Sequence, residues 1–322
     1  MTAQTETFPQ EDRPRRFDHR ALFFDDEQDF LDTTVPFLKE GVEADEVVMA
    51  VVTADKIKLL EDALGPSGEA VQFADGASWY QHPVQAMAAY DAFLKSQAPR
   101  PIRLVAESNW GDRRAHEVVE WLRYDAIVNA AFRDDNVRCI CCFDRRALHP
   151  DHPEILEYAR YAHPDLIDAG ISRSNSGYLE PGTVSEMCDR QFAEPAPASA
   201  ASMQVDPMGL HAVRDFVARH AERRGLAAGP LRDLLVAVTE VASNAIRHGT
   251  APITVRVWTS GDGLYCEVID AGDWRPDALV GYLPPVSAAD PGFGLWGVRM
   301  LCDVVTVQPT PDGTTVRLRT TL

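Results

Sequence analysis

The sequence predicts a two-domain protein, with an α/β domain built on a parallel sheet followed by an α+β domain. Strand-like and helix-like segments alternate from Phe17 to Ala162, a pattern typical of a sheet with helices on both faces. The run EPAPASAAS at 194–202 then has the composition of a linker. After it, a long amphipathic helical pattern precedes strands of alternating polarity, and 322 residues are enough for two domains.

The N-terminal elements follow one another without long gaps. We expect strands at 20–24, 47–52, 71–73, 102–106 and 137–143, and helices at 27–41, 54–64, 78–97, 115–132 and 153–162. No GxxxxGK[ST] phosphate loop follows any of these strands. We therefore expect the first domain to have RecA-like or flavodoxin-like layering without a P-loop.

The same patterns divide the chain into four stretches. We expect a flexible arm at 1–16, the first domain at 17–165, a connector and linker at 166–202, and the second domain at 203–322.

The second domain is organised around LRDLLVAVTEVASNAIRHG, residues 231–249. Its apolar residues recur at the spacing of one buried helix face. Glu240, Asn244 and His248 fall four residues apart on another stripe, with Arg247 beside them. One helix therefore presents an acid, a carboxamide and an imidazole in a row.

Two later motifs supply partners for that row. The alternating run 264–269 reads as a strand and ends at Asp270, with Gly272 allowing a sharp turn. The motif Gly292-Phe-Gly294-Leu295 opens a helix, where backbone amides and the helix dipole favour a phosphate. A last strand begins at 313–316, with Thr314 near its start.

Residues 203–322 resemble the GHKL ATP-binding sandwich of gyrase, heat-shock chaperone ATPases, histidine kinases and MutL, most closely the RsbW-like anti-sigma factor serine kinases. The resemblance implies Glu240 as the base for phosphoryl transfer, Asn244 as a Mg²⁺ ligand, and Asp270 as the contact to the adenine amino group. The cofactor, Mg-ATP, is implied to contact Asn244, Arg247, His248, Asp270, Gly272, Gly292, Gly294, Leu295 and Thr314. Phosphoryl transfer requires such hard oxygen ligands and backbone amides.

The family likeness also implies partners and leaves alternatives open. It implies a sigma factor, an anti-sigma antagonist whose serine is phosphorylated, and a homodimer. However, Trp274 stands where the family often has a second glycine. A non-catalytic, nucleotide-dependent protein-binding switch is therefore an alternative to the serine/threonine kinase. A histidine kinase using His211 or His220 is a third.

The first half resembles the MEDS domain, a bacterial sensory domain proposed to recognise small organic compounds. The resemblance covers about residues 17–165. The residues that carry it are 19–24, 34–41, 107–110, Asn129 and 141–144. The sequence departs from the family at two positions, with Phe143 in place of an expected Tyr and Asp125 in place of an expected Glu. It makes a small-molecule ligand an expected partner. The candidate pocket residues are His19, Glu107, Trp110, Asn129 and Asp144.

Charge and composition exclude other classes. The net charge is −18, of which residues 1–200 carry −16 from 20 basic and 36 acidic side chains. Such a surface repels phosphates, so we expect no nucleic-acid partner.

No apolar run reaches the length of a membrane span and no signal peptide opens the chain, so we expect a cytoplasmic protein. Cys139 and Cys142 have CxxC spacing, but residues three apart in a strand face opposite sides, which argues against a zinc site from this pair.

Overall fold

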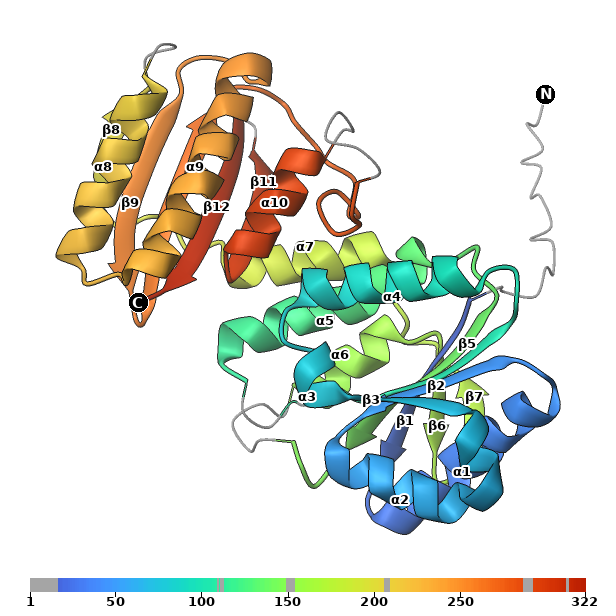
Figure 1. Cartoon of the computed structure of the whole chain (residues 1–322). Coiled ribbons are helices and arrows are strands. Elements are labelled where there is room, and N and C mark those ends of the chain that lie inside the picture. The colour runs from blue at the N-terminus through green and yellow to red at the C-terminus, as the bar shows by residue number, and fades with distance from the viewer. Residues whose placement is uncertain are drawn as a thin grey trace, which may run out of the picture.

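The computed structural model describes residues 17–108, 110, 113–148, 154–205, 209–285, 292–310 and 313–322. The arm expected at 1–16 and Asn109 of the pocket motif lie outside these residues. Two layered units follow one another along the chain, each with its own sheet (Figure 1).

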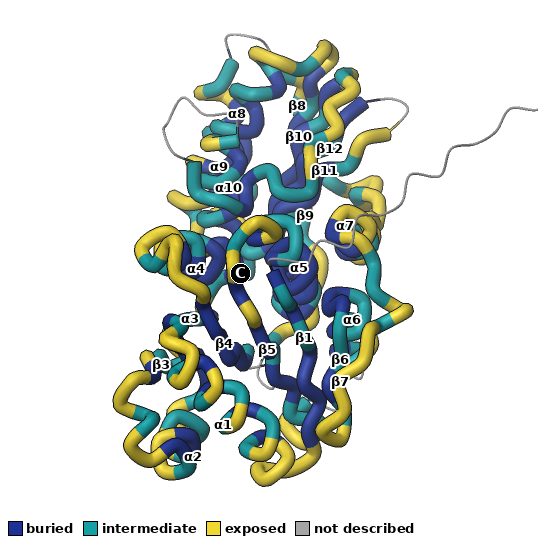
Figure 2. Tube along the Cα trace, turned by 90° about the vertical axis from the view of Figure 1, so that its right-hand side faces the viewer, coloured by how far each residue is buried: buried dark blue, intermediate teal, exposed yellow. Residues whose placement is uncertain are grey.

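The first unit is a seven-stranded sheet in the order β3-β2-β4-β5-β1-β6-β7. All neighbouring pairs are parallel except β6 and β7. Its strands are β1 (Phe17–Phe24), β2 (Val47–Val52), β3 (Val71–Asp75), β4 (Ile102–Ala106), β5 (Val137–Asp144), β6 (Asp165–Asp168) and β7 (Ile171–Ser174). The central strands are buried, as parallel strands covered on both faces require (Figure 2).

Helices cover both faces of this sheet (Figure 1). One face packs against α1 (Glu27–Glu43) and α2 (Ala54–Leu64), and the other against α4 (Pro83–Gln97), α5 (Ala115–Ala131) and α6 (Ile155–Ala162). Two short elements, η1 (Gly65–Ala70) and α3 (Gly76–Trp79), flank β3. The α/β layering expected from the alternation is confirmed.

The structure departs from the sequence patterns at two places. The single helix expected at 78–97 is broken into α3 and α4, because Pro83 occupies the first turn of α4 and the His82 side chain caps it by accepting from the Val84 N–H. The stretch 166–202, expected as a connector, contains most of β6, all of β7, α7 (Pro181–Gln191) and the start of β8 (Ala201–Gln204). Helix α7 packs along α5.

The second unit is an antiparallel sheet in the order β11-β12-β10-β9-β8, with helices on one face (Figure 1). The remaining elements are β9 (Thr254–Ser260), β10 (Gly263–Asp270), β11 (Val304–Thr310), β12 (Gly313–Thr321), α8 (Leu210–Arg223), α9 (Ala228–His248) and α10 (Phe293–Leu301). The core lies between the helices and the sheet. This confirms the α+β sandwich.

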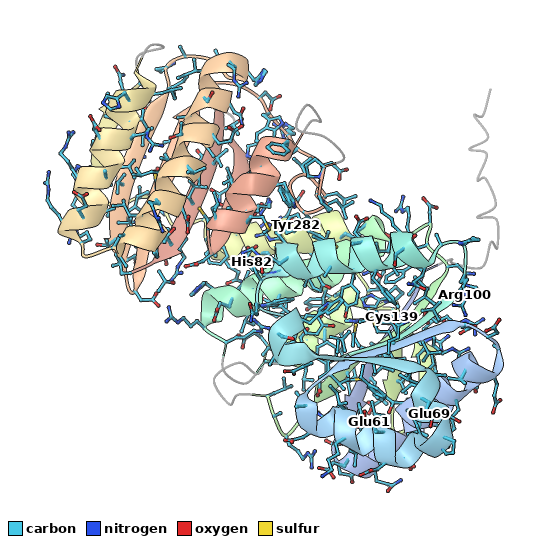
Figure 3. All side chains as sticks on the ribbon, in the orientation of Figure 1. Glu61, Glu69, His82, Arg100, Cys139 and Tyr282 are labelled. Carbon is cyan, nitrogen blue, oxygen red and sulfur yellow. The ribbon has the colours of Figure 1, made fainter. Side chains whose placement is uncertain are left out.

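The two units share an interface. Helix α10 packs against α4, and β11 packs against α5 and α7. Tyr282, from the segment that precedes α10, is 1% exposed and belongs to the hydrophobic core of the first unit. It lies near His82 at the junction (Figure 3). None of the helices within the described ranges is both long and apolar enough to traverse a bilayer.

Candidate functional site

The predicted polar row lies along one side of α9. This helix buries Leu234, Val238 and Val241 against the sheet, which leaves Glu240 and Asn244 half-buried at its flank. The Asn244 Nδ2 donates a hydrogen bond to the Glu240 Oε1 at 3.0 Å.

Two further residues of the row lie toward the end of α9. The Arg247 Nη2 donates to the Asn244 Oδ1 at 2.9 Å and lies 3.9 Å from the Glu240 Oε1. His248, the last residue of the helix, is exposed. The structure therefore brings Glu240, Asn244 and Arg247 into one hydrogen-bonded set.

The N-terminus of α10 lies directly against that set. Gly292 caps the helix with a positive φ of 94°, a conformation that favours glycine. A Cβ on Gly294 would lie 2.2 Å from the Glu240 Oε1, so any larger residue would displace the Glu240 side chain from this position. Leu295 is buried and anchors the helix in the core. Backbone amides at a helix N-terminus can bind phosphate oxygens, here close to the acid and the carboxamide.

A turn after β10 forms the second side of the site. The Asp270 Oδ1 accepts hydrogen bonds from the N–H of Gly272 at 2.7 Å and of Thr250 at 3.2 Å. The Thr314 hydroxyl donates to the Gly272 carbonyl at 2.9 Å and accepts from the Trp274 N–H at 3.0 Å. Backbone N–H groups therefore hold the carboxylate, and the Thr314 hydroxyl holds the turn.

These residues fit Mg-ATP. Asn244 supplies a hard oxygen ligand of the kind Mg²⁺ prefers, and the approach permitted by Gly294 leaves backbone amides beside it. The Asn244 Oδ1 accepts one hydrogen bond from Arg247, which leaves its second lone pair for Mg²⁺. Bound Mg-ATP would supply the phosphoryl group and charge neutralisation.

The segment between Gly272 and Gly292 begins with exposed side chains and then enters the junction between the units. Trp274 is 44% exposed, and the Arg275 Nε donates to Asp273 at 2.8 Å. Further along, Tyr282 accepts a hydrogen bond from Arg299 of α10 at 3.0 Å. Residues 286–291 of this segment, including Pro291, lie outside the described residues.

The histidines of the alternative histidine-kinase hypothesis lie on α8. His211 is exposed and 3.5 Å from Asp215. His220 packs edge-on against Phe216 at 4.7 Å between ring centroids.

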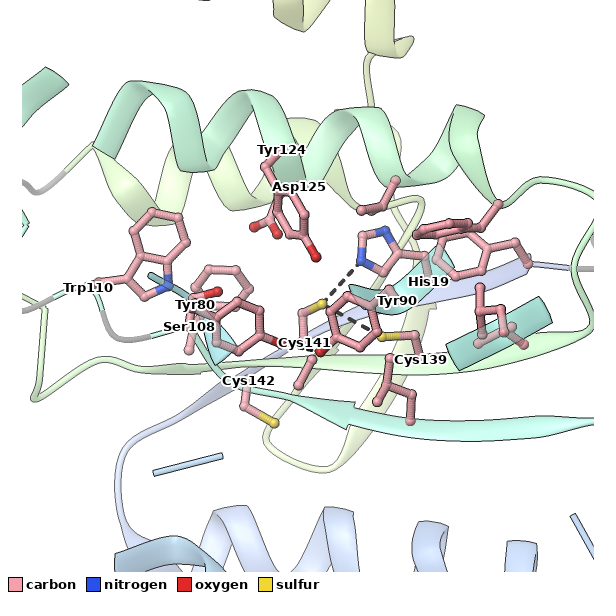
Figure 4. A pocket seen from close by; sticks show the side chains of 18 residues that line it. His19, Tyr80, Tyr90, Ser108, Trp110, Tyr124, Asp125, Cys139, Cys141 and Cys142 are labelled. Atoms are coloured by element: carbon pink, nitrogen blue, oxygen red, sulfur yellow. Dashed lines mark hydrogen bonds between the residues drawn. The ribbon is translucent and has the colours of Figure 1, made fainter. Parts of the chain in front are cut away.

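The first unit encloses a cavity of about 40 Å³ between β1, β4 and β5 on one side and α4 and α5 on the other (Figure 4). Aromatic side chains form much of its wall, and the hydroxyls of Tyr80 and Tyr90 lie 2.5 Å apart. Trp110 stacks on Phe143 at 5.9 Å. A space of this size suits a ligand of a few non-hydrogen atoms.

The predicted pocket residues fall into two groups. His19 and Trp110 line the cavity, and Asn129 lies behind His19, accepting a hydrogen bond from the His19 Nδ1 at 3.0 Å. Glu107 and Asp144 instead face Lys56. Glu107 forms an ion pair and hydrogen bond with Lys56, and Asp144 lies 3.8 Å from the same ammonium. Burial raises the pKa of Glu107, and the charge of Lys56 opposes that rise.

Several cavity residues were not predicted from the sequence, namely Tyr80, Tyr90, Tyr124, Asp125, Cys139, Cys141 and Phe143. Burial raises the pKa of Asp125 to about 7 and lowers that of His19 to about 4. The alternation of side chains along a strand could have predicted that the two cysteines lie together. Cys139 and Cys141 are two residues apart, so they share a face of β5.

Comparison with known families assigns both units. Residues 18–164 match the MEDS family, described as the methanogen/methylotroph, DcmR sensory domain, and residues 203–320 match the histidine kinase-like ATPase domain. The chain thus carries a MEDS domain at its N-terminus and a GHKL-like ATPase domain at its C-terminus. No curated protein sequence matches it.

Solved structures give weaker likenesses. The RsbU and RsbW domains of Rv1364c from Mycobacterium tuberculosis match at 22% identity and a TM-score of 0.30, over 39% of this chain and 33% of that one. The EL346 blue-light activated histidine kinase of Erythrobacter litoralis matches at 19% identity and a TM-score of 0.25, over 35% of this chain and 42% of that one. The first match spans about a third of the length of that protein.

Proposed function

We propose that this chain, a MEDS domain joined to a GHKL-like ATPase domain, is a signalling regulator that binds Mg-ATP and phosphorylates a serine or threonine of a partner protein. The observation that carries the proposal is the Glu240–Asn244 pair, hydrogen-bonded at 3.0 Å and approached by Gly294 at the start of α10. An acid, a magnesium ligand and phosphate-binding amides are the parts that phosphoryl transfer needs.

In the proposed reaction Glu240 accepts the proton of the attacking hydroxyl. The substrate oxygen forms a bond to the γ-phosphorus, and the bond to the ADP oxygen breaks. Asn244 holds Mg²⁺, and Asp270 receives the adenine amino group. The two backbone N–H groups that bind Asp270 keep its carboxylate in position.

The proposed partners are a sigma factor and an anti-sigma antagonist that carries the phosphorylated serine. This part of the proposal follows from the likeness of residues 203–322 to RsbW-like kinases. A homodimer through the ATPase domain belongs to the same proposal.

The interface supports control of the ATPase domain by the MEDS domain. Tyr282 belongs to the segment that corresponds to the lid of GHKL proteins, and it is buried in the core of the MEDS domain. Arg299 of α10 bonds to it, so a shift of α4 or α5 would reach the helix whose N-terminus faces the nucleotide site. We propose that a small ligand in the MEDS cavity acts through this contact.

A second candidate function is a nucleotide-dependent protein-binding switch without transfer. Trp274 favours the switch, because this large exposed side chain stands where the family often has glycine. The backbone N–H of Trp274 donates a hydrogen bond to the Thr314 hydroxyl. In this case ATP would alter partner affinity only.

Transfer of labelled phosphate separates the two functions. We expect labelling of a serine on the antagonist in the presence of Mg-ATP, and at least about a 100-fold loss in Glu240→Ala, since general-base catalysis contributes about 10²–10⁴-fold. Asp215→Ala, an exposed acid on α8, is the matched control and should transfer normally. ATP binding without transfer to any antagonist would favour the switch.

A further inference from the structure

A cluster of nitrogen, sulfur and oxygen ligands surrounds the inner end of the MEDS cavity. His19 from β1 and Cys139 and Cys141 from β5 each place a ligand atom within 4.8 Å of the others. Asp125 from α5 and His163, which follows α6, form an overlapping set with Cys141 at the same spacing. Figure 4 shows His19 and both thiols beside the strands, with Asp125 facing them from α5.

Hydrogen bonds fix which nitrogen of His19 faces the thiols. The Asn129 Nδ2 donates to the backbone oxygen of Ala162 at 2.7 Å, which orients its Oδ1 toward His19. The His19 Nδ1 must then carry the proton, because a carboxamide oxygen only accepts. The bare Nε2 lies 3.1 Å from the Cys141 Sγ. A histidine held in this way by a second residue is typical of metal sites.

His163 is held in the same manner. Its Nδ1 lies 2.7 Å from the Ala159 carbonyl and must donate to it, which leaves a bare Nε2. Among the described residues, that buried Nε2 has no hydrogen-bond partner, and the same holds for the Asp125 Oδ2. A buried polar atom without a partner costs about 1–3 kcal/mol. Two residues with such atoms beside the Cys141 thiol indicate that a bound species completes them.

The separation of the two thiols matches one particular geometry. The Sγ atoms of Cys139 and Cys141 lie 3.8 Å apart. Two thiolates bound to zinc at about 2.3 Å and the tetrahedral angle would also lie about 3.8 Å apart. The strand puts both side chains on one face about 6.6 Å apart, and their orientation brings the two sulfur atoms to this separation.

We propose that His19, Cys139 and Cys141 bind a thiophilic divalent cation, Zn²⁺, in the MEDS cavity, with the fourth position on the side of His163 and Asp125. Two thiolates neutralise a divalent cation, so the filled site carries no net charge when Asp125 stays protonated or outside the first shell. A buried cluster of this kind avoids the cost of isolated charges. The cavity beside the cation gives a small organic ligand direct access to it.

Cys139 and Cys142, the pair with CxxC spacing in the sequence, do not form the proposed zinc site together. The thiol of Cys142 lies on the opposite face of β5, in the core beneath α1 and α2. Cys142 therefore supplies a control from the same strand that leaves the proposed ligands untouched.

The test uses the full chain, reduced and stripped with a chelator, and titrated with Zn²⁺ and separately with Co²⁺. We expect one equivalent of Zn²⁺ per chain and, with Co²⁺, the intense visible and thiolate charge-transfer bands of a tetrahedral sulfur-containing site. Cys141→Ser should weaken Zn²⁺ binding by more than about 100-fold, because loss of an outer partner alone costs about 10–100-fold. Cys142→Ser should bind as the wild type does.

Three outcomes would overturn the proposal: wild-type chain that binds no Zn²⁺, a Co²⁺ spectrum without thiolate bands, or equal losses in Cys141→Ser and Cys142→Ser. The wild-type Co²⁺ spectrum decides the matter even if Cys141→Ser does not fold, as judged by circular dichroism. None of these results bears on ATP binding in the other domain.

Discussion

The Arg299 Nη1 donates a hydrogen bond to the Tyr282 hydroxyl at 3.0 Å, and the guanidinium carbon lies 4.2 Å from the centre of the tyrosine ring. Arg299 belongs to the helix that begins at the proposed phosphate site, whereas Tyr282 is buried in the core of the MEDS domain. Both residues belong to the ATPase domain by sequence, so the burial of Tyr282 in the MEDS core links α10 to the other domain.

Removing the Tyr282 ring should weaken both domains at their interface. We expect Tyr282→Ala to lower the free energy of unfolding by about 3–5 kcal/mol, as for other buried aromatic truncations. Hydrogen exchange should rise in α4 and in α10 together, because each packs on this contact.

Tyr282→Phe is the control for that prediction. It retains the ring and removes the hydroxyl bonded to Arg299, so it should cost about 0.5–1.5 kcal/mol. Faster exchange confined to the ATPase domain in Tyr282→Ala would contradict a role in coupling.

A methyl group on Gly294 should disturb the proposed catalytic pair. Its Cβ would lie 2.2 Å from the Glu240 Oε1, so Glu240 would have to leave Asn244. Displacements of this kind cost about 1–3 kcal/mol, and we expect phosphoryl transfer to fall by about 10–100-fold in Gly294→Ala.

The same helix offers a matched control. A Cβ on Gly297 would have no neighbour within 4 Å among the described residues, and Gly297→Ala should stabilise α10 by about 0.5–1 kcal/mol with normal transfer. Equal transfer rates in the two variants would rule out the close approach as a requirement of the reaction.

Asp270→Asn tests the proposed adenine contact. The substituted side chain keeps an oxygen for the Gly272 and Thr250 N–H groups but loses the charge. A hydrogen bond to a charged group is worth about 1.5–3 kcal/mol, so calorimetry should show ATP affinity lower by about 10–100-fold. Asp273→Asn, an exposed carboxyl three residues later, should bind ATP normally. Equal affinities in both variants would exclude Asp270 as the adenine contact.

The ammonium group of Lys56 neutralises the charge of the buried Glu107 carboxylate in the MEDS domain. Replacing it in Lys56→Met leaves Glu107, which is 5% exposed, without its main counter-charge, and such losses cost about 3–5 kcal/mol. The double variant Lys56→Met/Glu107→Leu should recover part of that loss in urea denaturation.

The loss of folding stability in Lys56→Met should also depend on pH. Burial raises the pKa of Glu107, so its contribution favours folding at low pH and is lost as the pH rises through the folded-state pKa. Without Lys56 the pKa rises further, and the destabilisation in Lys56→Met should be smaller at about pH 4 than at pH 7. A loss independent of pH would show that Glu107 does not titrate between the two values.

Local periodicity was sufficient for most of the fold. The pattern 231–249 predicted α9 and its polar row, because positions four apart in a helix share a side wherever the helix is placed. The start of the connector was harder to predict. Strand β6 has four residues and its place beside β1 depends on pairing with a strand over a hundred residues away, which local patterns do not contain.

The cavity was predicted only in part for a similar reason. His19 and Trp110 stood at strand ends or loops and could be proposed, whereas Tyr80, Tyr90 and Tyr124 come from elements that meet only in the folded chain. Glu107 followed a strand as a ligand-binding acid would, yet its partner is Lys56 from α2.

The most direct test of the proposed nucleotide site is calorimetric titration of Mg-ATP into the full chain. Wild-type chain should bind Mg-ATP, Asn244→Ala should lose most of the Mg²⁺-dependent affinity, and Ser243→Ala on the neighbouring stripe of α9 should retain it. Saturable binding that disappears only in Asn244→Ala would support the account. Wild-type chain that does not bind Mg-ATP would contradict it.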